Sequence, residues 1–559
     1  MRSLSSFVLV FLISCATLPL ARSQEMSAEE HAHMGTAVGY VPREVLQQPI
    51  TLRHNIGIEN DPVTTKNTEA QAFYNQGMAY IHSYVWVNAA RSFNQALRLD
   101  PALALAHIGL FRVFINLDDL PAAGEEIQQA QALQASISDR ERRRIDVSVA
   151  HLAAMQDLRD ATKHAAYKKA IETALDKNPE DVELWLLRGN AEEAAADGRG
   201  QGGHAGSIAF YEAALARSPD NFAAHHYLIH SYEVIGRNDL AEKQGERYAQ
   251  LADGVPHAHH MWGHDLRLVG RIDDAIRQFE TADQLERLWY KNDGLDPSLD
   301  WHRPHNLDLL SRSLQYEGRM HEAEVYIREA MQLQPTTMYA GYGKKALSDF
   351  LIARGRYQAA VEAAVPMQQS KWPLGRLGGH LVKARALLAM NKVADARKEL
   401  AEAEAEIPAC KEQFKGAVTF ERIAGDQLNE VKGEVLLRAP DATAVDLKQG
   451  DDLLRQAADS LSSHRGADAL AELYLLEHIG RVARERDRWE LAAHAADLMA
   501  AFDQNYFGSR YAAGLVAEHL GNAAKAGHEM SAAKELWKRA DAGSPEMATV
   551  EGKLATSIR

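Results

Sequence analysis

A recurring spacing of small residues restricts the possible folds of this chain more than any other feature. Residues 70–101 read AQAFYNQGMAYIHSYVWVNAARSFNQALRLDP, with a spaced series made of Gly77, Ala89, Phe93, Ala96 and Pro101. Glycine and alanine let two antiparallel helices approach closely, an aromatic ring fills the gap between them, and a proline stops the second helix. The segment therefore predicts a helical hairpin.

The same signature recurs, with decay, along most of the chain. Its later members are Tyr211, Ala214 and Pro219; Gly236 and Ala241; Gly263, Gly270, Ala275 and Phe279; Gly318, Ala323, Ala330 and Pro335; Gly355 and Ala360; Ala396, Ala403 and Pro408; and Gly514, Gly521 and Ala533. This pattern resembles the 34-residue tetratricopeptide (TPR) repeat. The resemblance implies an all-α fold, a right-handed superhelical solenoid of roughly ten to twelve stacked antiparallel helix pairs.

Length and composition agree with an array of repeats. A chain of 559 residues is too long for one compact core, and its Ala- and Leu-rich tracts lack the alternation that predicts strands. We expect the TPR-like array over residues 67–408, with histidine-rich units at 222–310. Residues 409–559 are expected to form less regular helical repeats that end in a TPR-like unit at 507–540.

The first 23 residues have the features of a secretory signal peptide. Arg2 precedes an apolar run from Phe7 to Ile13, and small residues suit cleavage before Gln24. We therefore expect an exported protein, periplasmic or secreted. A rival interpretation is an outer-membrane lipoprotein, because the residues before Cys15 resemble a lipoprotein box that would leave this cysteine lipidated.

Residues 24–66 lack helical periodicity and are expected to form an extended arm. The arm could trail freely or lie along the superhelix. Thr65, Asn67 and Thr68 are each suitable caps for the first helix of the array.

Charge and cysteine content exclude several classes of function. The net charge is −15, and removal of residues 1–23, which hold two arginines and no acids, takes it to −17. Such a surface repels nucleic acid. No later segment reaches the roughly 18–20 apolar residues that a membrane helix needs, so we expect no integral membrane segment. Cys410 alone remains after cleavage, which leaves no intramolecular disulfide.

Histidines are concentrated in the middle of the predicted array. Residues 204–305 hold 10 of the 24 histidines, about three times the density found elsewhere. In the TPR family the second, fifth, ninth and twelfth positions of each first helix line the concave groove. Carried over to this chain, the resemblance places in the groove His226, His230, Glu233, His257, His260, His264, Arg267, His305, Asp308 and Arg312, with His302 one turn before His305.

Two of these helices contain a His-x-x-x-His pair, which brings both rings to one helical face. Rings from adjacent units could meet around a transition-metal ion such as zinc or copper. The candidate ligands are His226, His230, His260, His264 and His305, with Glu233 or Asp308 as a further ligand or general base. Two alternatives remain: a metal-free polar or pH-sensitive groove, and histidines that serve only the structure.

His225 and His259 face away from the groove in this register and are expected to pack. The segment 288–304 interrupts the repeat with Gly294 and Pro297, and a loop there is the best candidate for a lid. The chain lacks the phosphate-binding loop, the hydrolase nucleophile elbow and the haem attachment motif.

Two functions are consistent with the sequence. The first is an exported scaffold that holds a protein or peptide, or its own N-terminal arm, in the concave groove. The second is a metal-binding protein or metal-dependent enzyme built on the histidines. The solenoid fold alone favours a binding protein over an enzyme, because its repeats stack and offer a long concave surface without any catalytic residues.

Overall fold

The computed structural model describes residues 41–57, 60–158, 160–193, 202–333, 344–413, 418–463 and 469–557. Within these ranges the regular elements are all helical. None of the helices described there is long and apolar enough to cross a membrane. The predicted signal peptide at 1–23 and the alternative lipid anchor at Cys15 lie outside the described residues.

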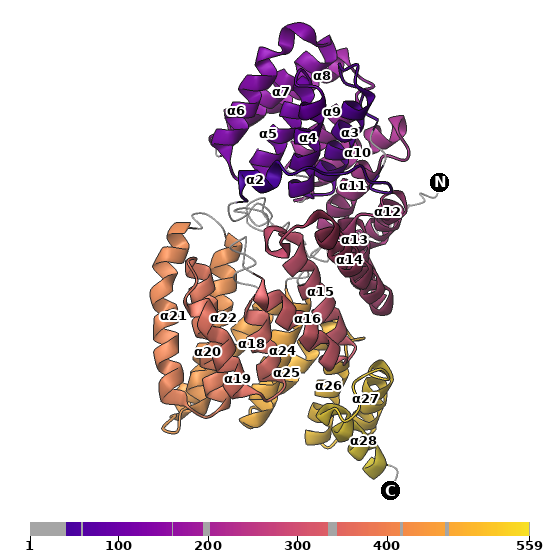
Figure 1. Ribbon diagram of the computed structural model, residues 1–559. Helices are drawn as coiled ribbons and strands as arrows, with labels where there is room; N and C mark the ends of the chain where they lie inside the picture. Colours follow the sequence, from indigo (N-terminus) through magenta and orange to yellow (C-terminus); the bar gives the residue numbers. More distant parts are fainter. Residues whose placement is uncertain are drawn as a thin grey trace, which may run out of the picture.

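Successive helices pack against each other as stacked antiparallel pairs (Figure 1), which confirms the predicted all-α solenoid. The N-terminal helices are α2 (Arg43–Leu46), α3 (Thr68–His82), α4 (Trp86–Leu99), α5 (Ala104–Asn116), α6 (Leu120–Ala132), α7 (Asp139–Met155), α8 (Ala161–Lys177), α9 (Val182–Asn190) and α10 (Ile208–Arg217). The central helices are α11 (Phe222–Val234), α12 (Asn238–Leu251), α13 (Pro256–Leu268), α14 (Ile272–Asp293), α15 (His302–Tyr316) and α16 (Met320–Gln332).

The C-terminal half continues the pairing. Its helices are α18 (Lys345–Ala353), α19 (Tyr357–Gln368), α20 (Pro373–Ala389), α21 (Val393–Gln413), α22 (Val418–Arg438), α23 (Ala444–Ser462), α24 (Ala469–Glu485), α25 (Trp489–Phe502), α26 (Phe507–His519), α27 (Ala523–Leu536) and α28 (Pro545–Ser557). Short 3-10 turns lie at η1 (Gln134–Ser136), η2 (Ala205–Ser207) and η3 (Pro297–Leu299). Helix α21 continues past Pro408, and Cys410 within it packs into a hydrophobic core.

The small residues of the repeat have the structural role expected of them. A Cβ atom added at Gly77 would lie 2.5 Å from the ring of Phe93, which is fully buried between the helices. Gly236 and Gly270 end the first helices of two later units with φ of 71° and 80°, a left-handed conformation that favours glycine. Asn67, one of three candidate caps, accepts hydrogen bonds from the backbone N–H groups of Glu69 and Ala70.

Two large hydrophobic cores meet within α13. The first extends from Val41 to Met261, with Trp289 added from α14, and the second runs from Leu266 to Val516. In Figure 1, α13 and α14 lie between the indigo-to-magenta N-terminal half and the orange-to-yellow C-terminal half. The histidine-rich helices α11, α13 and α15 therefore lie where the two halves join.

The chain also returns on itself at this junction. The turn between α3 and α4 reaches α11 and α12, where Tyr248 donates a hydrogen bond to Ser83 at 2.9 Å. From the other half, Tyr474 in α24 donates to the carbonyl of Arg312 in α15 at 2.7 Å. Segments from both halves of the chain therefore contact helices of the histidine-rich units.

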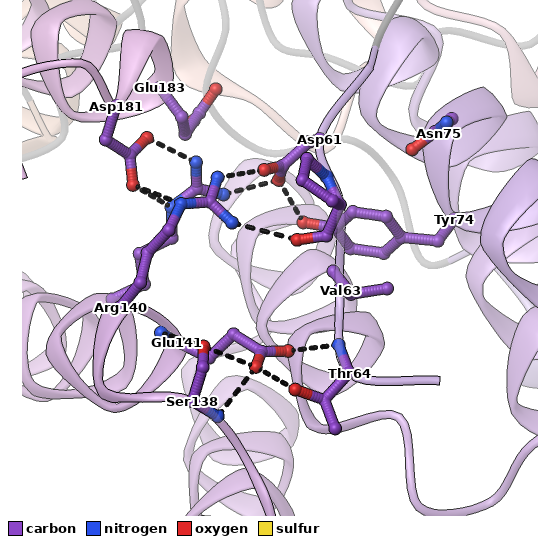
Figure 2. Close-up of polar contacts among 12 residues, drawn as sticks. Asp61, Val63, Thr64, Tyr74, Asn75, Ser138, Arg140, Glu141, Asp181 and Glu183 are labelled. Carbon is purple, nitrogen blue, oxygen red and sulfur yellow. Dashed lines mark hydrogen bonds and ion pairs between the residues drawn. The ribbon is translucent and has the colours of Figure 1, made fainter. Parts of the chain in front are cut away.

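Residues 41–57 and 60–66 lie along the protein. Arg53 forms an ion pair with Asp293 at 2.5 Å and stacks on the ring of Trp289, so it joins the segment to α14. Figure 2 shows the following residues, where Asp61 contacts Arg140 of α7. Asp61 also pairs with Arg144 of the same helix.

The Asp61 contact is a buried network of charges. Arg144 bridges Asp61 and Asp181 at 2.5 Å each, and Tyr74 donates a hydrogen bond to Asp61 at 2.7 Å. Burial opposes ionisation of Asp61, but Arg144 and Arg140 outweigh it and hold its pKa below the usual range. This network of ion pairs and hydrogen bonds joins residues 60–66 to α3, α7 and the start of α9.

Replacement of Asp61 by alanine should remove one of the two carboxylates that compensate buried Arg144. We expect the free energy of unfolding to fall by about 3–5 kcal/mol, because Arg140 and buried Arg144 would then share the single carboxylate of Asp181 and leave buried positive charge unbalanced. Equilibrium urea unfolding followed by circular dichroism measures it. Asp139→Ala is the control, since solvent screens the ion pair of this exposed residue with Arg142 and its loss should change the unfolding free energy much less. Equal losses of unfolding free energy in the two variants would contradict the conclusion that Asp61 compensates the buried charge of Arg144.

Candidate metal centre

Helices α11 and α13 are equivalent elements of repeats 34 residues apart. His225 Nδ1 lies 2.6 Å from Gln244 Oε1, and His259 Nδ1 lies 2.7 Å from Gln278 Oε1. The two contacts join each first helix to the second helix of its own unit in the same way. Both histidines thus face inward within the pair, and the opposite faces carry the remaining histidines of these helices.

Three imidazoles from α11 and α13 converge. His226 Nε2 lies 3.3 Å from His230 Nε2 and 3.2 Å from His257 Nε2, and one nitrogen from each of the three lies within 4.8 Å of the other two. We call these residues the three-histidine cluster. A tetrahedral ion with metal–nitrogen bonds of about 2.0–2.1 Å holds its nitrogen ligands about 3.3 Å apart. The two shortest spacings in the cluster match this value.

Hydrogen bonding alone accounts poorly for this geometry. His226 Nδ1 lies 2.6 Å from the carbonyl oxygen of His82, so Nδ1 carries the proton and Nε2 has a single lone pair. That lone pair has two close neighbours, His230 and His257, and cannot accept well from both. His257 Nδ1 is buried without a hydrogen-bond partner. A cation bound by the three Nε2 lone pairs removes the competition at His226.

Burial keeps the two innermost rings of the cluster neutral. His226 is 0% exposed and His257 is 4% exposed. Burial, reinforced by the neighbouring histidines, lowers the pKa of both rings well below the ordinary value. Neutral imidazole is the form that binds metals, so the environment prepares both rings as ligands near neutral pH.

The α3–α4 turn covers the cluster on one side. The ring centroid of Tyr84 lies 4.6 Å from that of His226 and 5.2 Å from that of His257. Tyr84 has a φ of 56°, a left-handed conformation that costs a non-glycine residue roughly 1–2 kcal/mol. Its carbonyl accepts a hydrogen bond from Trp301 at 3.0 Å. The turn therefore packs directly on the rings of His226 and His257.

Glu233 lies on the other side of His230. Its Oε2 is 3.6 Å from His230 Nδ1, and its Oε1 is 2.6 Å from His264 Nδ1. Burial opposes ionisation of Glu233, but the two histidines outweigh it and hold its pKa below the usual range. A carboxylate behind a ligating histidine is a common feature of metal sites, because it orients the ring and makes it more basic.

Asp265 completes a second group of ligand atoms. One atom from each of Glu233, His264 and Asp265 lies within 4.8 Å of the other two, and we call these residues the carboxylate cluster. Asp265 is 0% exposed, and neither of its carboxyl oxygens accepts a hydrogen bond. Burial, followed by the charge of Glu233, raises the pKa of Asp265 well above its ordinary value.

The remaining histidines form a row that leads to α15. The ring of His260 lies 4.6 Å from that of His302 and 4.8 Å from that of His305, measured between centroids. His260 Nδ1 contacts Asn306 at 3.0 Å, and His302 Nδ1 contacts Glu286 at 2.6 Å. These oxygen partners fix the two rings within the core.

The segment predicted as a lid packs over this row. Trp301 stacks near His305 and edge-on to His302, with centroid distances of 6.2 and 5.6 Å. Tyr290 donates a hydrogen bond to Asp300 at 2.6 Å and anchors the residues before Trp301 to α14. The segment covers the histidine row in this structure.

The predicted site residues separate into distinct groups. Of the five candidate metal ligands, His226 and His230 belong to the three-histidine cluster, whereas His260, His264 and His305 do not. The third member, His257, was predicted for the groove only.

The other groove residues have local partners. Arg312 pairs with Asp308 at 2.9 Å beneath α24, and Arg267 is buried. Arg267 and Arg312 are thus largely buried in this structure.

Sequence reasoning missed three residues of the site: His82, Tyr84 and Asp265. His82 and Tyr84 belong to the first unit, and only the curvature of the whole solenoid brings them to α11. Asp265 was detectable in principle, because an acidic residue beside His264 on a largely buried helix needs a partner.

A third group of possible ligands, Glu430, Glu434 and His478, lies in the C-terminal half. Arg385 binds Glu430 at 2.7 Å and Arg438 binds Glu434 at 2.6 Å, so each carboxylate already has a guanidinium partner. The two glutamates raise the pKa of His478 against the effect of burial. This group is a charge-compensated ion network and needs no cation.

No protein-family model and no curated protein matches the chain. Among solved structures, a human IFIT1 dimer with PPP-AAAA is 13% identical, with 78% of this chain and 90% of that chain covered and a TM-score of 0.38. The Cut9–Hcn1 hetero-tetramer of APC/C is 11% identical (88% and 91% covered, TM-score 0.30). Yeast Tom70 is 11% identical (88% and 97% covered, TM-score 0.27). These identities and scores give no information about function.

Neutral His257 should make stability depend on pH. The unfolded chain takes up a proton at this histidine below about pH 6.5, whereas the folded apoprotein does not, so the contribution of His257 is present above that pH and is lost below it. From pH 6.5 to 5.5, the unfolding free energy of wild type relative to His257→Gln should fall by about 1 kcal/mol. Urea unfolding with a chelator measures the difference. The same difference at both pH values would contradict the neutral assignment.

Proposed function

We propose that this protein binds a transition-metal ion through His226, His230 and His257 on a helical-repeat scaffold. The observation that carries the proposal is the 3.2–3.3 Å spacing of His226 Nε2 from the Nε2 atoms of the other two rings. The His82 carbonyl and Glu233 lie behind two of the rings and supply the outer contacts that such sites use.

Three neutral nitrogen ligands favour zinc or copper over magnesium, calcium or manganese, which prefer oxygen ligands. Three protein ligands also leave a tetrahedral ion one further position, to be taken by water or a small ligand. The site is buried beneath Tyr84, with access on the side of His230 and Glu233, whose side chains are 13% and 17% exposed. We therefore propose a metal-binding role and assign no reaction.

The alternative hypothesis of a peptide in the concave groove has less support at these residues. The α3–α4 turn and α24 cover the predicted groove positions in α11, α13 and α15. Residues 41–57 cross α3, α4 and α14. A protein partner would therefore need a different surface of the solenoid from the one that the repeat register indicated.

The test is metal binding by protein purified without a histidine tag. We expect isothermal titration of the chelator-treated protein with Zn²⁺ to show binding, and His257→Gln to weaken the affinity of this site by at least about 100-fold, more than loss of an outer contact costs. Saturation at about 100 times the dissociation constant should stabilise the fold by about 2.7 kcal/mol, visible as a rise in Tm.

His259→Gln is the matched control. It replaces a histidine two positions away on α13 whose ring contacts Gln278 and the carbonyl of Asp253 and does not reach the cluster. Its Zn²⁺ affinity should equal that of wild type. Equal binding by both variants, or no binding and no thermal shift in wild type with Zn²⁺ or Cu²⁺, would refute the proposal.

We further propose that the metal-binding protein acts outside the cytoplasm, on the basis of the signal-like residues 1–23. Expression in a bacterial host should yield mature protein in the periplasm or medium that begins at Gln24. Mass spectrometry of the N-terminal peptide distinguishes this product from a chain lipidated at Cys15. An intact Met1 in a cytoplasmic fraction would contradict export.

A further inference from the structure

We propose that Glu233, His264 and Asp265, the carboxylate cluster, form a second divalent-cation site next to the three-histidine cluster. The inference goes beyond the proposed function, because the ligand atoms are different and come from a different donor set. One nitrogen and two carboxylate groups suit a first-row divalent ion such as Zn²⁺, Fe²⁺ or Mn²⁺.

The geometry brings the donors together from two helices. Glu233 lies at the end of α11, while His264 and Asp265 are adjacent in α13, and the three ligand atoms lie within 4.8 Å of one another. His264 Nδ1 and Glu233 Oε1 are already in contact at 2.6 Å. An ion would take the place of the proton in that contact, with a slight separation of the two atoms.

Asp265 supplies the independent observation. Its side chain is fully buried and neither carboxyl oxygen accepts a hydrogen bond from a donor, although a buried carboxyl group normally has one; its polar neighbour is the carboxyl group of Glu233, and two such groups in contact must share a proton or a cation. The packing leaves no room for a longer side chain opposite it, since a Cβ atom at Gly245 would collide with Asp265 Oδ2 and would lie 3.1 Å from the backbone of Trp262. The backbone of α12 thus approaches closely and holds the carboxyl group at the cluster.

Charge also favours a cation at this position. Glu233 and Asp265 can carry two negative charges, and His264 is a neutral ligand when its Nδ1 is deprotonated. A divalent ion would balance both carboxylates in a buried environment, where unpaired charge is expensive. The nearby three-histidine cluster contains no negatively charged ligand, so the two ions would not draw on the same negative charges.

The two sites adjoin through one imidazole. His230 offers Nε2 to the three-histidine cluster, while its Nδ1 lies 3.6 Å from Glu233 Oε2. Glu233 therefore acts as an outer contact of the first ion and a ligand of the second. The arrangement predicts two ions per chain, with different donor sets.

The experiment counts Zn²⁺ per chain in full-length, tag-free protein that has been stripped with chelator, reloaded and desalted, with inductively coupled plasma mass spectrometry as the readout. We expect two ions in wild type, one in Asp265→Asn and one in His257→Gln. Asp253→Asn, an exposed carboxylate close by in sequence, is the matched control and should retain two. Circular dichroism confirms that each variant is folded, and His264→Gln provides a second test that does not depend on Asp265.

The outcomes separate the two sites. One ion in wild type that is kept in Asp265→Asn and His264→Gln but lost in His257→Gln would overturn the second site and leave the first in place. One ion kept in His257→Gln but lost in Asp265→Asn would support the second site and refute the first. No ion in any of the proteins would refute both.

Discussion

The contact between the α3–α4 turn and α11 determines what the histidine-rich repeats can do. His226 donates its Nδ1 proton to the carbonyl of His82, 144 residues earlier in the chain. Without this contact the rings of His226 and His257 would be hydrated, and water favours the protonated form of imidazole. With it, these two rings are buried and neutral, and His226 Nε2 keeps a free lone pair.

The same contact has an energetic cost that a bound ion would offset. Several imidazoles are buried here, Tyr84 adopts a left-handed backbone conformation, and His257 and Asp265 have polar atoms without hydrogen-bond partners. Each such buried group costs on the order of 1–3 kcal/mol. Local costs of this kind persist only when the surrounding packing enforces them, and they are concentrated at functional sites. An ion that binds only the folded state would return part of that energy as stability.

Much of the fold follows from local sequence, and much of the site does not. Gly77 and Phe93 specify how two helices pack, and the same residue types at later positions specify the same packing, so the stacked pairs are predictable. The register also placed His226 and His230 on one face. The partners Tyr84 and His82 depend on the accumulated curvature of many units, a small rotation per repeat that no single segment encodes. His257 was placed on the correct face but not among the ligands, because the axial offset between adjacent first helices decides which ring reaches the preceding unit.

The repeat also explains why the two clusters differ in their donors. His226 and His230 correspond to His260 and His264 one unit later, so each unit supplies an imidazole pair. His257 provides the third ring of the first cluster, and it lies 34 residues after the equivalent position in the preceding unit. The equivalent position in the following unit is His305. It lies 48 residues after His257, because α14 is 22 residues long and η3 comes after it.

His305 approaches His260 at 4.8 Å between ring centroids, close to the 4.9 Å between His257 and His226. His264 nevertheless turns toward Glu233, whose own equivalent in the second unit is Arg267, a residue that cannot bind a cation. The two members of the second imidazole pair, His260 and His264, therefore belong to different groups of side chains. His260 joins the histidine row of α15, and His264 joins the carboxylates of Glu233 and Asp265, so that a duplicated motif yields two side-chain clusters of different chemistry.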